Sequence, residues 1–176
     1  MLQARELLLL LRSSERRVSF VPGNCDPPSL TENIEDIESI HGKCRQVDTT
    51  NFFGVGGSSP TPLGTPFELA EGHIANLLEQ DFSGCNSARK TVLVSHSPPV
   101  NTSLYLVFSG EHVGSASVRE FIERTRPALA LCGHIHEARG IDNIDGTVIV
   151  NPGPAGRGSC ALVDVAEKVT VELGHL

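Results

Sequence analysis

The feature that most constrains the fold is an alternation of short β-type runs with helical segments along the chain. Helices are predicted at 1–12, 31–40, 65–79 and 117–124, and strands at 18–21, 45–48, 51–55, 91–95, 128–132, 146–150, 160–165 and 168–172. This alternation predicts an α/β fold, and the last three strands, which no helix separates, indicate an antiparallel or mixed edge.

Local signals mark the ends of these elements. Capping boxes, in which Ser or Thr is followed three residues later by Glu, begin at Ser29, Thr65 and Ser117 and predict three of the helix starts. The stretch 54–60, rich in glycine and ending in proline, is predicted to be a surface loop.

Length and composition narrow the class of protein. A chain of 176 residues is enough for one domain, expected to span 1–176. The leucine run 7–11 is far shorter than the roughly 18–20 residues of a membrane span. No secretion signal follows Met1, so a cytoplasmic location is expected. The five cysteines form no C-x-x-C pair, which favours reduced thiols.

The net charge of −7 argues against general nucleic-acid binding and against a membrane-surface role. An anionic substrate would therefore need positive charge from another source, such as metal ions.

Polar side chains of metal-ligand type follow three of the predicted strands. They are Asn24 and Asp26 after the first, His96 after 91–95, and His134 with His136 after 128–132. Ligands of open α/β sheets bind at this edge. Imidazole nitrogens together with an amide oxygen favour a catalytic Mn, Fe or Zn site over a closed structural zinc site.

Four motifs carry a resemblance to a known family. They are Val-Pro-Gly-Asn-Cys-Asp at 21–26, Val-Leu-Val-Ser-His-Ser-Pro-Pro at 92–99, Cys-Gly-His-Ile-His at 132–136 and Asn-Pro-Gly at 151–153. In this order, and over almost the whole chain, they resemble the calcineurin-like metallophosphoesterases, in particular the small prokaryotic and archaeal members. The resemblance implies a sandwich of two mixed β-sheets flanked by helices.

The resemblance also implies a site with two divalent ions, Mn, Fe, Zn or Ni. Asn24, His96 and His134 are expected to hold one ion, and His136 to help hold the other. Such a pair would clamp a phosphate ester and activate a bridging water for in-line attack. The expected activity is hydrolysis of phosphate esters, with His96, Cys25 and Asp26 in the catalytic set.

The chain departs from the family pattern in two places. Cys25 stands where many relatives have a histidine, and this favours a phosphodiesterase over a monoesterase. The Asp-x-His and Gly-Asp motifs of the family do not occur in the sequence. We therefore expect the N-terminal strand-helix-strand unit to be missing, one ion to be bound rather than two, and hydrolysis by this chain to be weak or absent.

Other interpretations stay open at this point. Arg139 and Arg157 follow the last two motifs and are candidates for binding the substrate phosphate. A non-catalytic scaffold on the same fold, which binds partner proteins, is the alternative function. A homo-oligomer is compatible with the sequence.

Overall fold

The structure is a computed structural model that describes residues 4–13, 16–87, 89–105 and 113–176. Its centre is a six-stranded mixed sheet with the strand order β3-β4-β5-β6-β8-β7. The strands of this sheet are β3 (Cys44–Val47), β4 (Thr50–Val55), β5 (Lys90–Ser95), β6 (Leu129–Leu131), β7 (Gly140–Ile144) and β8 (Thr147–Asn151). The four inner strands run parallel, while β3 and β7 pair antiparallel at the two edges.

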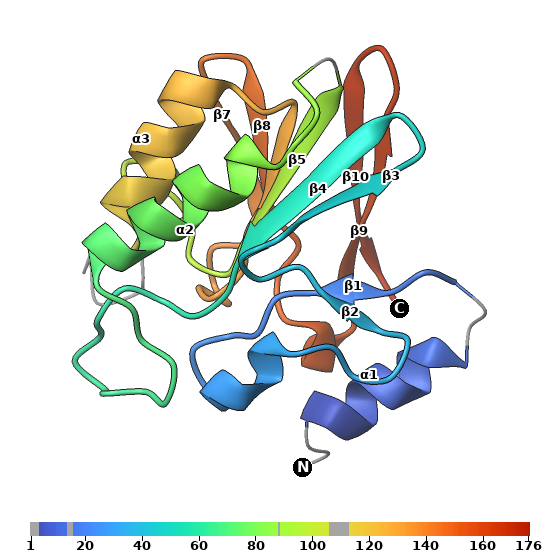
Figure 1. The fold of residues 1–176 in the computed structure, drawn as a ribbon, viewed down its shortest axis with the longest axis vertical. Helices are drawn as coiled ribbons and strands as arrows, with labels where there is room; N and C mark the ends of the chain where they lie inside the picture. Colours follow the sequence, from blue (N-terminus) through green and yellow to red (C-terminus); the bar gives the residue numbers. More distant parts are fainter. Residues whose placement is uncertain (1–3, 14–15, 88, 106–112) are drawn as a thin grey trace.

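Helices cover one face of this sheet and a β-hairpin covers the other (Figure 1). The helices α2 (Glu71–Ser83) and α3 (Ala116–Thr125) close a core around Phe53, Leu93 and Ile122, which are all fully buried. The hairpin of β9 (Ser159–Val165) and β10 (Val169–His175) packs its valines on the opposite face. The α/β sandwich of two sheets flanked by helices is thus confirmed, with the hairpin as its second sheet.

The N-terminal part lies at one end of the sheets (Figure 1). It contains α1 (Ala4–Arg12), the parallel pair β1 (Ser19–Phe20) and β2 (Glu38–Ser39), and the short 3-10 helix η1 (Pro28–Thr31). Residues 1–3 of the predicted first helix lie outside the described residues. A second 3-10 helix, η2 (Ala155–Arg157), precedes β9.

The predicted helix 31–40 is wrong. The N–H groups of Glu38 and Ile40 donate to the carbonyls of Val18 and Phe20, so this segment is used to pair with β1. Backbone pairing with a distant strand outweighs the local capping signal at Ser29, and only the single turn η1 forms there.

The helix predicted from Thr65 begins later, at Glu71. The Thr65 N–H does donate to Glu68, as it would in a capping box, at 2.7 Å. However, the Phe67 N–H donates to the carbonyl of Asn24, which keeps the segment extended. The helix predicted at 117–124 is confirmed as α3, although its N-cap is Ser115, two residues before Ser117.

Two further expectations are corrected. The stretch 54–60 is not a surface loop, because its residues 54–58 are buried and the first two belong to β4. Strand β7 was not predicted, since its sequence Gly-Ile-Asp-Asn-Ile lacks a continuous apolar run and pairs only as an edge.

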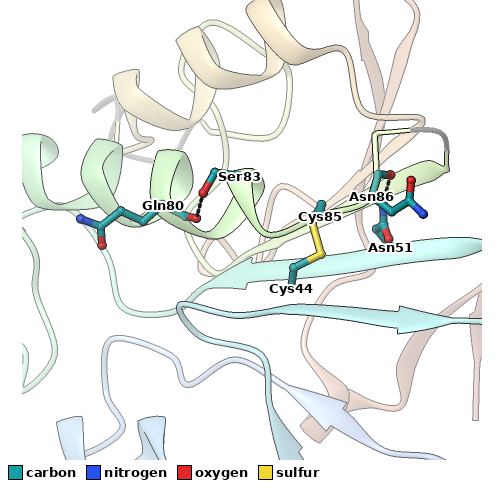
Figure 2. The surroundings of a disulfide bond; sticks show 6 residues. All are labelled: Cys44, Asn51, Gln80, Ser83, Cys85 and Asn86. Carbon is teal, nitrogen blue, oxygen red and sulfur yellow. Dashed lines mark hydrogen bonds between the residues drawn. A yellow bond between two sulfur atoms is a disulfide. The ribbon is translucent and has the colours of Figure 1, made fainter.

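A disulfide bond joins Cys44 of β3 to Cys85, just after α2 (Figure 2). The expectation of reduced thiols is therefore wrong for this pair, while Cys25, Cys132 and Cys160 are free. The two cysteines are 41 residues apart and come together only when α2 packs beside the sheet, so their spacing carries no signal. The Asn51 side chain supports the same junction by donating to the carbonyl of Asn86 at 2.8 Å.

None of the helices in the described ranges combines the length and the apolar character that crossing a bilayer requires.

Candidate metal centre

Three side chains of the predicted site converge at one point. The Oδ1 atom of Asn24 lies 3.0 Å from Nε2 of His96 and 3.2 Å from Nδ1 of His134. The two imidazole rings meet edge to face with their centroids 5.2 Å apart. Asn24 is 72 positions from His96 and 110 positions from His134 in the sequence. The fold therefore brings one oxygen and two ring nitrogens from distant segments to a common point.

The ends of two parallel strands position the histidines. His96 directly follows β5, and its N–H donates to the carbonyl of Val55 at the end of β4. Its own carbonyl accepts from the N–H of Gly133, just after β6, at 3.1 Å. Because β5 and β6 are neighbours, this bond joins the two loops that carry the imidazoles.

A tight turn after β6 directs His134 inward. His134 has a φ of +65°, an uncommon conformation for a residue with a side chain, and the Ile135 N–H donates to the Gly133 carbonyl at 2.7 Å. The buried Asn151 holds this turn, because its Nδ2 donates to the carbonyl of Ile135 at 2.8 Å. Asn151 belongs to the Asn-Pro-Gly motif, to which the sequence alone assigned no role.

The loop after β1 positions Asn24. Asp26 accepts from the N–H of Gly23 at 2.7 Å and closes the turn in which Asn24 lies. A side chain at Gly23 would meet the His96 ring, since an added Cβ would lie 2.9 Å from Cε1. The turn therefore approaches the imidazole as closely as glycine permits.

Burial keeps these imidazoles neutral. It lowers the pKa of His96 to about 3, and the nearby His134 and His136 add to the shift. The pKa of His134 is also lowered, first by burial and then by His136, against an opposing effect of Glu68. At neutral pH each ring therefore keeps one nitrogen without a proton, which is the form that binds metal ions.

The three facing atoms fit a divalent metal ion. Ligand atoms about 2.1 Å from an ion and at right angles are about 3.0 Å apart, close to the two separations at Asn24. Within the described ranges no three His, Cys, Asp or Glu side chains form a metal-holding group, so the set depends on the amide of Asn24. Two imidazoles and one amide can hold one ion and leave coordination positions open.

The remaining predicted residues lie around this point. His136 is exposed, yet it is close enough to influence the titration of His96 and His134. Cys25 is exposed with a free thiol beside Asn24. Arg139 donates to the carbonyls of Pro152 and Gly174, which ties two backbone segments together.

Arg157 is exposed in η2. A cavity of about 320 Å³ reaches His96 from between the two sheets, with Val94, Leu131 and Val163 in its walls. The described residues that line this cavity include no Lys or Arg, so they offer no fixed positive charge for a phosphate.

Two residues near the site were missed as functional candidates. Thr65 accepts a hydrogen bond from Nδ2 of Asn24 at 3.0 Å, and Glu68 accepts from the Thr65 hydroxyl at 2.7 Å. Both were interpreted as parts of a helix cap. The only available signal was that same Thr-x-x-Glu spacing, which does not reveal a partner 41 residues away.

Comparison with known proteins gives one matching family model, described as metallophosphoesterase, calcineurin superfamily, over residues 82–176. The chain is 39% identical over 147 residues to the uncharacterized protein MJ1162 of Methanocaldococcus jannaschii, a match covering 81% of this chain and 66% of that protein. It is 30% identical over 131 residues to the UPF0046 protein K07C11.7 of Caenorhabditis elegans, covering 72% of this chain and 41% of that protein.

Solved structures share the fold. The structure of TT1561 of Thermus thermophilus superposes with a TM-score of 0.73 at 18% identity, covering 97% of this chain and 77% of that one. A second solved structure gives a TM-score of 0.78 at 20% identity, covering 96% and 70%. The chain thus spans 66% and 41% of the two curated relatives and a larger share of the two solved chains.

Proposed function

Because the chain belongs to the calcineurin superfamily of metallophosphoesterases, we propose that it binds a divalent metal ion and hydrolyses phosphodiesters. Membership supports a phosphoesterase-type function in general, in a family that generally depends on two metal ions. The proposed ligands of the first ion are Asn24, His96 and His134, with His136 directed to a second ion.

One observation carries this proposal. The Asn24 Oδ1 atom lies within 3.0 Å and 3.2 Å of two imidazole nitrogens whose rings are neutral at pH 7. The amide oxygen accepts hydrogen bonds from these two ring nitrogens, and a cation that replaced the two ring protons would be held by the same three atoms. A chain with net charge −7 would also gain the positive charge that an anionic ester requires.

We assign the following roles to the residues of this site. Asn24, His96 and His134 hold the ion, and Asp26 and Asn151 hold the turns that carry them. A bound divalent ion supplies polarisation of the phosphate and positive charge for the transition state. Cys25 and His136, each next to or near a proposed ligand in the sequence, have exposed side chains.

Cys25 is the basis for proposing diesters over monoesters. A thiol is a weak hydrogen-bond donor and a poor substitute for the histidine of many relatives, which assists the leaving group. The exposed Cys25 therefore fits substrates whose leaving group needs less assistance.

The test compares metal binding and hydrolysis in one set of proteins. Mn²⁺ affinity is measured by calorimetry, and turnover is measured with bis-p-nitrophenyl phosphate against p-nitrophenyl phosphate. Removing one ligand in His96→Gln should abolish Mn²⁺ binding, whereas His175→Gln, in the exposed end of β10, should not. Turnover by the 176-residue chain is expected to be weak, and greater with the diester.

Other outcomes would revise the proposal. If His96→Gln binds Mn²⁺ as tightly as the wild type, the ion is bound at a place other than the one formed by Asn24, His96 and His134. Faster turnover of the monoester would remove the assignment of substrate class. No binding of Mn²⁺, Zn²⁺ or Ni²⁺ by the wild-type chain would reject the metal site and favour the alternative of a scaffold for partner proteins.

A further inference from the structure

The orientation of the Asn24 side chain decides whether the site can bind a cation. An asparagine amide has an acceptor oxygen on one side and a donor nitrogen on the other. Only the oxygen can bind a metal ion, so a rotation of the amide by half a turn would place an NH₂ group against His96 and His134. Some neighbouring group must therefore hold the amide in one orientation.

A chain of hydrogen bonds on the far side of Asn24 provides that constraint. The Nδ2 atom of Asn24 donates to Oγ1 of Thr65 at 3.0 Å, and the Thr65 hydroxyl donates to Oε1 of Glu68 at 2.7 Å. The same Oε1 atom accepts from the N–H of Thr65 at 2.7 Å and from the hydroxyl of Thr61 at 2.6 Å. Three donors therefore hold the carboxylate in place.

The direction of each bond follows from the chemistry of the groups. An ionised carboxylate only accepts, so the single hydroxyl proton of Thr65 must point at Glu68. With that proton committed, Thr65 can only accept on its Asn24 side, and the atom facing it must be Nδ2. The Oδ1 atom of Asn24 then faces the two imidazoles.

The Glu68 carboxylate is ionised at neutral pH. Hydrogen bonds from Thr61 and Thr65 lower its pKa to about 2. The backbone adds support, because the Phe67 N–H donates to the Asn24 carbonyl at 2.9 Å and so joins the two segments.

We propose that Thr65 and Glu68 are positioning residues, which hold the Asn24 amide with its oxygen directed at the metal position. This inference rests on the proposed metal site and adds two residues that act through Asn24 rather than on substrate. The Thr-Pro-Phe-Glu sequence that resembled a helix start thus acquires a role in the site.

The experiment measures Mn²⁺ affinity by calorimetry in Thr65→Val, which keeps the shape of the side chain and removes its hydroxyl. Loss of an outer hydrogen-bond partner of a metal ligand weakens binding about 10- to 100-fold, and we expect a loss of this size. Thr65→Ser should restore affinity. Thr147→Val is the matched control, because the buried Thr147 hydroxyl has no hydrogen-bond partner among the described residues, and this variant should bind Mn²⁺ as the wild type does.

A second background separates orientation from general damage. In Asn24→Asp, either carboxylate oxygen can face the imidazoles, so adding Thr65→Val should weaken Mn²⁺ binding far less than it does in the wild type. An equal loss in both backgrounds would refute the proposal, as would wild-type affinity in Thr65→Val.

A measurement without metal keeps the inference testable if the proposed function fails. Hydrogen exchange of the Asn24 side-chain amide, followed by NMR in metal-free protein, should be slow in the wild type and in Thr65→Ser. It should be fast in Thr65→Val. Equal exchange rates in all three proteins would overturn the inference, whether or not the wild type binds Mn²⁺.

Discussion

Replacing Gly23 by alanine should damage the metal position through a single added carbon. The new Cβ would lie 2.9 Å from Cε1 of His96 and 3.3 Å from both ring nitrogens. Carbon atoms in favourable contact are about 3.5–4.0 Å apart, so the ring must move by roughly 0.6–1.1 Å. A shift of that size breaks the 3.0 Å approach of Nε2 to Asn24.

The expected cost follows from two opposing effects. Overpacking of this kind costs about 1–3 kcal/mol, and replacing glycine by alanine returns about 0.4–1 kcal/mol by restricting the unfolded chain. The midpoints of these two ranges leave a net loss of about 1.3 kcal/mol, which should lower Tm by about 3–5 °C in a domain of this size. Mn²⁺ affinity should fall about tenfold or more, because the imidazole no longer points at the ion.

The matched control is Gly72→Ala. Gly72 lies in α2, and an added Cβ there would meet no atom within 4 Å in the described part of the chain outside its own helix backbone. This variant should be as stable as the wild type or more stable by up to about 1 kcal/mol, with unchanged Mn²⁺ affinity. The assay is thermal unfolding with and without Mn²⁺, together with calorimetry. If Gly23→Ala matches the wild type in both measurements, the ring does not need the space and the reasoning is refuted.

Three further predictions concern the same framework. His96 titrates near pH 6.5 when unfolded and near pH 3 when folded, so between these values the unfolded state binds more protons and stability falls on acidification. Between pH 7 and pH 5 the free energy of unfolding of the metal-free wild type should therefore fall by about 2 kcal/mol more than that of His96→Gln, because the slope of about 1.4 kcal/mol per pH unit applies below pH 6.5. Urea unfolding at the two pH values measures this difference, and equal falls in the two proteins would contradict the prediction. The bond from Cys44 to Cys85 closes a segment of 41 residues, so reducing it should cost about 4 kcal/mol, measured by urea unfolding with and without dithiothreitol. If dithiothreitol does not change the urea midpoint, the disulfide bond does not stabilise the folded chain. Asn151→Ala removes one of the two donors to the carbonyl of Ile135, which also accepts from the Ala138 N–H at 3.2 Å. Loss of this hydrogen bond should cost about 0.5–1.5 kcal/mol and weaken Mn²⁺ binding, and an unchanged Mn²⁺ affinity would show that this turn does not support the metal position.

Much of the fold follows from local sequence because buried strands need apolar runs. The apolar run that forms β5 could be predicted as a strand for this reason. The positions of His96 and His134 directly after two predicted strands also placed them at one edge of the sheet. Local signals failed where a backbone group had two possible partners. The capping boxes at Ser29 and Thr65 each favour a helix, but pairing with β1 and with the Asn24 carbonyl outweighs them.

The sequence by itself determined the α/β class, the order of the motifs and the residue types at the candidate site. Only the tertiary structure decided that Cys44 pairs with Cys85 and that the Asn24 amide directs its oxygen at two imidazoles. Burial, which lowers the pKa of His96, is likewise a property of the packed molecule. The physical reason is the same in each case: hydrogen-bond direction, disulfide pairing and desolvation depend on distances between segments far apart in the chain, and local sequence does not encode those distances.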